Sequence, residues 1–224
     1  MENIGKVSHW VFYLGDTRLV LNSTTLVMTW VVIGFVLAFA WVATRGRSIV
    51  PGPWQQLAEL LVQWFRELVR DALGDAYEER YFPLICGMFI FLLLCNWVGV
   101  LPGMEEPTKD INTTLGLGVM GFFIAHGTAI RVKGLKQYIK EYFEPMFFLM
   151  PLNVVGEVAK VISISFRLFG NIMGGSIIIV VVTHLAYGLV LPPFLYGFFG
   201  LFVGTVQAFV FTMLTLVYIS VQIR

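Results

Sequence analysis

The sequence predicts an all-α integral membrane protein that forms a single domain over residues 1–224, with about five membrane helices and one amphipathic surface helix. Hydrophobic residues make up 58% of the chain and charged residues 13%, against about 25% charged residues in soluble domains. The mean hydropathy is +0.80. A soluble fold of 224 residues cannot bury this much apolar surface. Uncharged runs of at least 18 residues recur, and each is long enough to cross a bilayer.

The same features exclude several classes of protein. The net charge is +1, and no basic stripe is interleaved with aromatic residues, so nucleic acid is not an expected partner. The chain has no G-x-x-x-x-G-K-[ST] motif for a nucleotide. His9, His126 and His184 fall on separate segments, so we expect no metal, haem or other cofactor. Cys86 and Cys95 lie in one apolar run and read as small hydrophobic residues.

Residues 26–43 predict the first membrane helix, because they contain no charge. Arg45 and Arg47 follow it, and the positive-inside rule places this end in the cytoplasm and the N-terminus outside. Residues 53–74 start at a Pro-Gly-Pro sequence and alternate leucines and aromatics with charges at helical spacing. This is an amphipathic helix, which lies either on the cytoplasmic membrane surface or against other protein.

Residues 81–130 predict a helical hairpin with spans at 81–103 and 112–130, joined by a short acidic loop. The distribution of basic residues supports one orientation, with the C-terminus in the cytoplasm. The segments assigned to the cytoplasm carry Arg45, Arg47, Arg66, Arg70, Arg80, Arg131, Lys133, Lys136, Lys140 and Arg224. Those assigned to the outside carry Lys6, Arg18 and Lys109.

Residues 151–222 predict two long helices, separated by the LVLPP sequence at 189–193. Their uninterrupted lengths of about 38 and about 30 residues correspond to about 57 Å and about 45 Å. The hydrocarbon core is about 30 Å thick, so each helix is strongly tilted, bent or broken.

The first of these helices carries an arginine at a costly position. Arg167 shares one helical face with Lys160, Ser163 and Asn171, and no acidic residue lies within nine residues of it. A charged arginine at the centre of a membrane helix costs about 3 kcal/mol on insertion scales. It either bonds backbone carbonyls structurally or meets a partner from outside. Gly170 and Gly174, spaced as G-x-x-x-G beside the stripe, would let such a partner approach.

Two further polar features have a structural and a functional interpretation. Glu157 and Lys160 are spaced as i and i+3, which suits a structural ion pair or a part of an ion path. Gln207 follows Gly197, Gly200 and Gly204 on one face of the last helix. It either makes an interhelical hydrogen bond or joins Arg167 in one intramembrane site. Arg167 cannot relay a proton, but it can favour the charged form of a carboxylate on another subunit, which then releases its ion.

The sequence SISFRLFGN, with QAFVFTMLTLVYIS at 207–220, PLNVVGEVAK and PTKDINTTLGL, closely resembles subunit a of the F-type ATP synthase over nearly the whole chain. The resemblance implies a component of a rotary ATP synthase that is not catalytic by itself. Two half-channels would pass H⁺ to and from carboxylates of a c-subunit ring, coupling the ion gradient to ATP synthesis. The last two helices would tilt around that ring. The b-subunit peripheral stalk, other synthase subunits and the lipid of the plasma membrane would be the further partners.

By position, the resemblance makes Arg167 the essential arginine between the half-channels and places Asn171 and Gln207 beside it. Asp110 and Asn112 match the outer loop near the outside half-channel, and Glu157 matches a carboxylate of the cytoplasmic side.

The chain departs from the family pattern at two positions. Many members carry an acid or histidine where this chain has Ser176 or Gly200. Either His126, His184 or Asp110 replaces that titratable group, or ordered water suffices, or the ion is Na⁺, with H⁺ the favoured interpretation.

Two hypotheses from other classes compete with this interpretation. A self-contained secondary transporter would bind an anionic substrate at Arg167, but the chain has no inverted repeats of the kind such transporters contain. An intramembrane quinone or haem enzyme would need paired histidines or a quinone pocket.

Overall fold

The computed structural model of the chain describes residues 9–14, 17–45, 52–101, 103–143, 148, 150–185 and 191–223. Within this part of the chain, five helices are long and apolar enough to cross a membrane, which confirms the predicted class. They comprise α1 (Ser23–Thr44), α3 (Asp75–Trp97), α4 (Ile111–Lys133), α6 (Met150–Leu185) and the helix that ends as α8 (Gly204–Ile223). Two 3₁₀ turns, η1 (Val98–Val100) and η2 (Pro107–Lys109), lie in the connection between α3 and α4. The basic residue Arg47 lies outside the described residues.

The predicted amphipathic helix is α2 (Pro53–Leu73), which begins with a proline in its first turn. Its second half packs on the chain itself, because Phe65 and Val69 are fully buried in the core. Its first half leaves Trp54 and Leu60 61% and 71% exposed. The helix therefore has both a protein-facing part and an apolar face that is free within this chain.

Charged side chains join α2 to the start of α3. Arg66 Nε lies 3.3 Å from Glu78 Oε1, and Arg70 Nε donates a 2.7 Å hydrogen bond to Glu78 Oε2. This bond raises the pKa of the Arg70 guanidinium, which is charged at any physiological pH.

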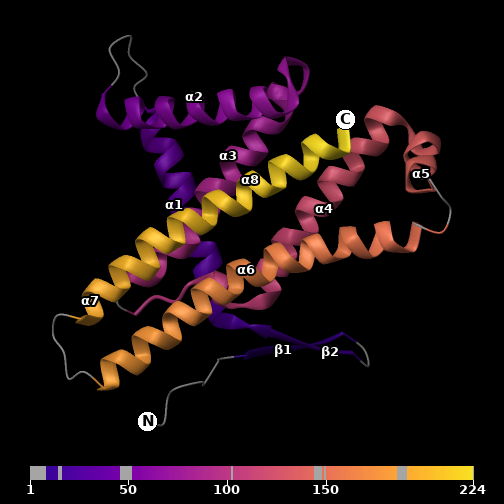
Figure 1. The fold of residues 1–224 in the computed structure, drawn as a ribbon. Helices are drawn as coiled ribbons and strands as arrows, with labels where there is room; N and C mark the ends of the chain where they lie inside the picture. The colour runs from indigo at the N-terminus through magenta and orange to yellow at the C-terminus, as the bar shows by residue number, and fades with distance from the viewer. Residues whose placement is uncertain are drawn as a thin grey trace.

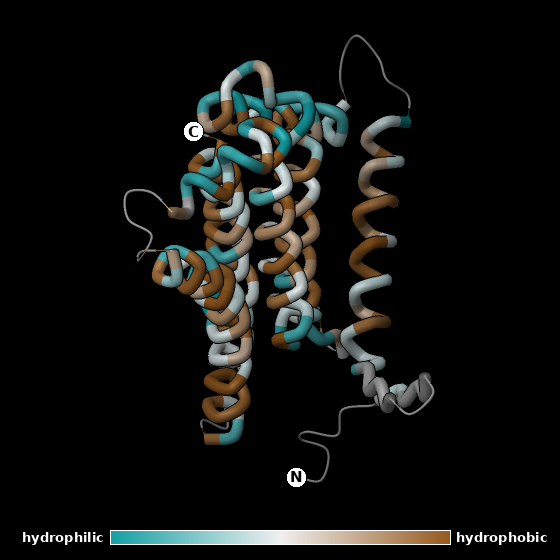
Figure 2. The backbone as a smooth tube through the Cα atoms, turned by 90° about the vertical axis from the view of Figure 1, so that its right-hand side faces the viewer, coloured by the Kyte–Doolittle hydropathy of each residue, from teal (hydrophilic) through white to brown (hydrophobic). Residues whose placement is uncertain are grey.

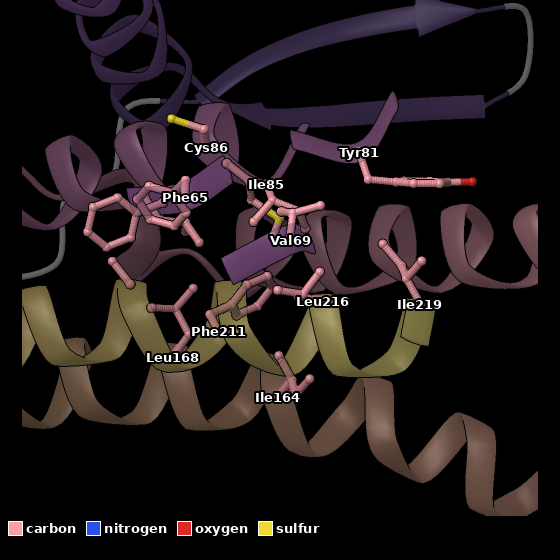
Figure 3. Packing of buried hydrophobic residues seen from close by; sticks show 14 of the residues in the cluster. Phe65, Val69, Tyr81, Ile85, Cys86, Ile164, Leu168, Phe211, Leu216 and Ile219 are labelled. Atoms are coloured by element: carbon pink, nitrogen blue, oxygen red, sulfur yellow. The ribbon is translucent and has the colours of Figure 1, made fainter. Parts of the chain in front are cut away.

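The hydrophobic core lies where α2, α3, α4, α6 and α8 meet. Figure 3 shows Phe65 and Val69 beside Ile85 of α3, with Phe211 and Leu216 of α8 between these residues and α6. By contrast, α1 buries only Ser23 and Val32 among its residues, and Figure 2 shows it standing beside the other helices. The core thus holds α6 and α8 in a defined register, while α1 has an apolar surface that lipid or another chain can cover.

Two short elements were not predicted. Strands β1 (His9–Leu14) and β2 (Thr17–Asn22) pair in an antiparallel hairpin before α1. The first, HWVFYL, is rich in aromatic residues, and the second, TRLVLN, carries a threonine and a valine, which are residue types that strands favour. Helix α5 (Leu135–Phe143) follows α4 after Gly134, whose φ of 82° suits glycine.

The two long helices are present and oblique to the rest of the bundle (Figure 1). Helix α6 has 36 residues, which corresponds to about 54 Å. The last span runs from α7 (Leu191–Tyr196) through the seven-residue π-helix η4 (Gly197–Val203) into α8. This π segment interrupts the regular α-helix. It is one of the irregularities that the sequence predicted in a helix longer than the membrane is thick. Residues 189 and 190 of the predicted turn lie outside the described residues.

Figure 1 also shows which elements share an end of the molecule. Helices α2 and α5 and the end of α8 lie at one end, and the hairpin and α7 lie toward the other. The former is called the α2–α5 end below. The segments that the sequence assigned to one side of the membrane therefore gather at one end of the fold.

Candidate functional site

The polar stripe of α6 faces away from the core. Ser163, Arg167 and Asn171 are exposed, whereas Ile164 and Leu168 on the adjoining face are buried. This division follows from the helical period, which puts residues three and four apart on one face. Among the residues that the structure describes, no carboxylate forms an ion pair with Arg167. The guanidinium is therefore presented on the outer surface of this chain.

The glycines beside Arg167 leave that surface open. A Cβ added at Gly170 or Gly174 would meet nothing within 4 Å in the described part of the chain. Gly175 is different, because it packs on the Phe199 ring of η4. The G-x-x-x-G pair is thus not used for packing inside this chain, and a surface of small residues lies next to the arginine.

One turn beyond Arg167, α6 and α8 are joined by a polar contact. Asn171 Nδ2 donates a 2.7 Å hydrogen bond to Gln207 Oε1. Gln207 is 4% exposed, and its amide is held in this position by the bond. The structure therefore brings the predicted polar residues of the two long helices together as a pair next to Arg167.

Asp110 forms a second polar group at the end of α4 where the helix begins. Its side chain caps α4 by accepting hydrogen bonds from the Asn112 backbone and side-chain nitrogens, at 2.9 and 3.0 Å. Its other oxygen, Oδ2, accepts bonds from Asn22 and from Thr25 Oγ1, at 3.4 and 3.3 Å. A pocket next to Asp110 is lined also by two residues of α6, Phe169 within the Arg167–Asn171 turn and Met173 just after it.

Glu157 forms the third polar group, toward the α2–α5 end. Lys160 Nζ lies 2.7 Å from Glu157 Oε1, which confirms the expected i, i+3 ion pair. The second carboxylate oxygen, Oε2, lies 4.0 Å from His126 Nε2 of α4. The Lys160 ammonium also lies 5.7 Å from the centre of the Tyr218 ring of α8.

Ser176 and His184 are not brought into these groups. Ser176 follows Arg167 by nine residues, which is about 14 Å along α6. His184 is exposed in the last turn of α6, further still from the arginine. His126 lies beside Glu157 and not beside Asp110.

Gly200, where the family resemblance led us to expect a titratable group, has no room for one. An added Cβ there would collide with the Val100 side chain. This contact gives a physical reason for a glycine at a position that the sequence left unexplained.

Sequence reasoning missed Asn96. It is fully buried in α3, donates a 2.8 Å hydrogen bond to the Gly204 carbonyl, and accepts one of 2.8 Å from Thr108 Oγ1. These bonds fasten the start of α8, three residues before Gln207, to α3 and η2. A lone amide inside the apolar run 81–103 was the signal that could have identified it.

Comparison with known proteins identifies relatives over nearly the whole chain. The model of the family described as ATP synthase A chain matches residues 26–220. The ATP synthase subunit a of Moorella thermoacetica is 36% identical over 210 residues, which cover 94% of each chain. That of Acidothermus cellulolyticus is 38% identical over 221 residues, 96% of this chain and 77% of its own. That of Legionella pneumophila strain Corby is 31% identical over 221 residues, 98% of this chain and 94% of its own.

Proposed function

The chain belongs to the ATP synthase A chain family, and from this membership we propose how its polar side chains move the coupling ion. As an ATP synthase subunit a, it is a multi-pass membrane protein and the stator subunit of the ion-translocating sector of an F-type ATP synthase. It is a component of the synthase and is not catalytic by itself. A self-contained transporter that binds an anion at Arg167 is not favoured by this membership.

The proposed rotor surface is the face of α6 that carries Arg167. The observation that carries this proposal is the exposed guanidinium, which has no carboxylate partner among the described residues and lies beside the open surface of Gly170 and Gly174. A charge in this position needs a partner, because an unpaired cation in a membrane is costly. A carboxylate of a c-subunit ring supplies that partner as it turns past.

The chemistry follows from the properties of arginine. Its guanidinium does not deprotonate, so it cannot carry the proton itself. A ring carboxylate that comes to face Arg167 is favoured in its charged form and releases its proton. The fixed positive charge also prevents cations from passing directly between the two sides. Each ion that crosses 100 mV releases about 2.3 kcal/mol. Rotation must therefore add the free energy of several ions to make one ATP.

Two half-channels lead to this surface. The outside one starts at Asp110 and Asn112, and the pocket there reaches Phe169 and Met173, on the side of α6 that faces away from Arg167. Ser176 follows Phe169 by seven residues and therefore adds a hydroxyl group to the Phe169 face of α6. The cytoplasmic one starts at Glu157 and Lys160, toward the α2–α5 end. We favour H⁺ as the ion, because titratable side chains lie at both ends.

The orientation and the other partners are part of the same proposal. Basic residues gather at the α2–α5 end, and by the positive-inside rule this supports the proposal that this end and the C-terminus are cytoplasmic and the hairpin lies outside the plasma membrane. The exposed apolar faces of α1 and of the first half of α2 are available to the b-subunit peripheral stalk and to lipid.

Replacing Arg167 tests the function. In inverted membrane vesicles, Arg167→Ala should abolish ATP-driven proton pumping while the complex keeps its subunits, because ring carboxylates then keep their protons. Arg131→Ala, which removes an exposed arginine at the end of α4, is the matched control and should pump normally. Pumping by an assembled Arg167→Ala complex at the rate of the control would refute the proposal.

A further inference from the structure

His126 and Glu157 face each other across the interface between α4 and α6. His126 Nε2 lies 4.0 Å from Glu157 Oε2, and the two side chains are 14% and 20% exposed. The other carboxylate oxygen, Oε1, already holds the Lys160 ammonium at 2.7 Å. One oxygen of Glu157 therefore meets a fixed cation, and the other is directed at an imidazole.

The second ring nitrogen determines which form of the imidazole faces Glu157. His126 Nδ1 lies 3.0 Å from the Phe122 carbonyl oxygen. A carbonyl oxygen only accepts hydrogen bonds, so Nδ1 carries the hydrogen in this contact. A neutral imidazole has one N–H, and Nε2 then carries the lone pair. The nitrogen that can accept a proton is thus the one that points toward the carboxylate.

The surroundings of His126 come from three other helices. Glu157 and Lys160 face it from α6, Tyr218 lines the same pocket from α8, and the Tyr138 ring of α5 lies edge-on at 6.0 Å between ring centres. Glu157 and Lys160 balance each other in charge, so a proton on His126 adds a positive charge next to a neutral pair. The pocket is lined by α4, α6 and α8, and the contact of His126 with Tyr138 puts it beside α5, at the α2–α5 end.

We propose that His126 is a proton-exchange residue that shuttles protons between Glu157 and the water at the α2–α5 end; this rests on the proposed ion path through Glu157. During outflow, the O–H bond of the protonated Glu157 carboxyl breaks and an N–H bond forms at His126 Nε2. The products are a carboxylate and an imidazolium. The imidazolium then gives its proton to water and returns to the neutral form, and inflow reverses both steps.

Two physical features suit this role. The 4.0 Å gap exceeds a direct hydrogen bond, so a rotation of the Glu157 carboxylate or one bridging water completes the transfer. An imidazole also suits this role chemically, because it can both accept and donate a proton and is the side chain that most often acts as a general acid and base.

The experiment uses assembled synthase in inverted vesicles and measures the initial rate of ATP-driven acidification between about pH 6 and about pH 9. His126→Gln keeps a polar side chain but cannot exchange a proton, and it should slow pumping about tenfold. His126→Ala leaves a space for the ring, so millimolar imidazole in the medium should restore its rate. His184→Gln and His184→Ala are the matched controls, with normal rates and no response to imidazole.

Wild-type rates and an unchanged pH profile in His126→Gln would overturn the proposal. So would a slow His126→Ala complex that does not respond to imidazole, since that result indicates a packing role. Arg167→Ala in the same vesicles separates the two proposals. If it pumps, the proposed function is wrong; if it is inactive while His126→Gln is normal, this inference alone is wrong.

Discussion

Asn171 of α6 and Gln207 of α8 form a 2.7 Å hydrogen bond one helical turn from Arg167. The two residues come from the two long helices, and Gln207 is buried while Asn171 lies at the exposed face. The bond therefore does two things at once: it fixes the lateral position of α6 on α8, and it holds a polar pair beside the arginine. Asn96 strengthens this arrangement from the other side, because it fastens the start of α8 to α3.

This pair should act as a unit in ion pumping. We expect Asn171→Leu and Gln207→Leu each to lower the pumping rate, and the double variant to be no slower than the slower single one, because either change removes the same bond. Coupling energies of such bonds in membrane proteins average about 0.6 kcal/mol, or about threefold in rate. The rates of vesicle acidification of the two single variants and the double variant, compared at equal subunit content, give this double-mutant cycle. Losses that multiply would show that the two residues act independently.

Arg167→Lys should be badly impaired although it keeps the charge. A lysine ammonium is a compact, strongly hydrated and titratable charge, and it does not present the planar fork of a guanidinium to a carboxylate. We expect a loss of pumping of at least about tenfold, the equivalent of 1.4 kcal/mol. The ratio of protons pumped to ATP hydrolysed in vesicles is the measurement. Coupling like that of the unchanged protein would mean that charge alone matters at this position.

Gly200 should not tolerate even a methyl group. Its Cβ would collide with Val100, so Gly200→Ala should destabilise the chain by about 1–3 kcal/mol through overpacking. Gly197→Ala is the matched control in the same π segment, where an added Cβ meets nothing within 4 Å. Val100→Ala in the Gly200→Ala background should recover the loss.

The stability of both glycine variants is measured by the amount of chain assembled in membranes and by the thermal midpoint of the purified complex. Equal stability of Gly200→Ala and Gly197→Ala would contradict the steric explanation for the missing titratable group.

Much of the fold could be predicted from local pattern. A membrane helix needs about 20 apolar residues in a row, and this requirement identified the five spans without any tertiary information. The surface helix was equally visible, because its leucines and aromatics recur at helical spacing. The β hairpin and α5 were missed because each is short, and short elements give a weak periodic signal beside the long apolar runs.

The candidate site divides in the same way. The stripe from Lys160 to Asn171 follows from the helical period alone, and the Glu157–Lys160 pair follows from i, i+3 spacing. The sequence by itself therefore determined the spans, the polar stripe around the arginine and the spacing that allows this ion pair, since each depends on residues within one helix. The tertiary structure decided that Asn171 bonds Gln207, that His126 faces Glu157, and that Val100 fills the space at Gly200. These contacts depend on how two helices are shifted and rotated against each other, which is set by packing of the shared core and not by the pattern of either helix.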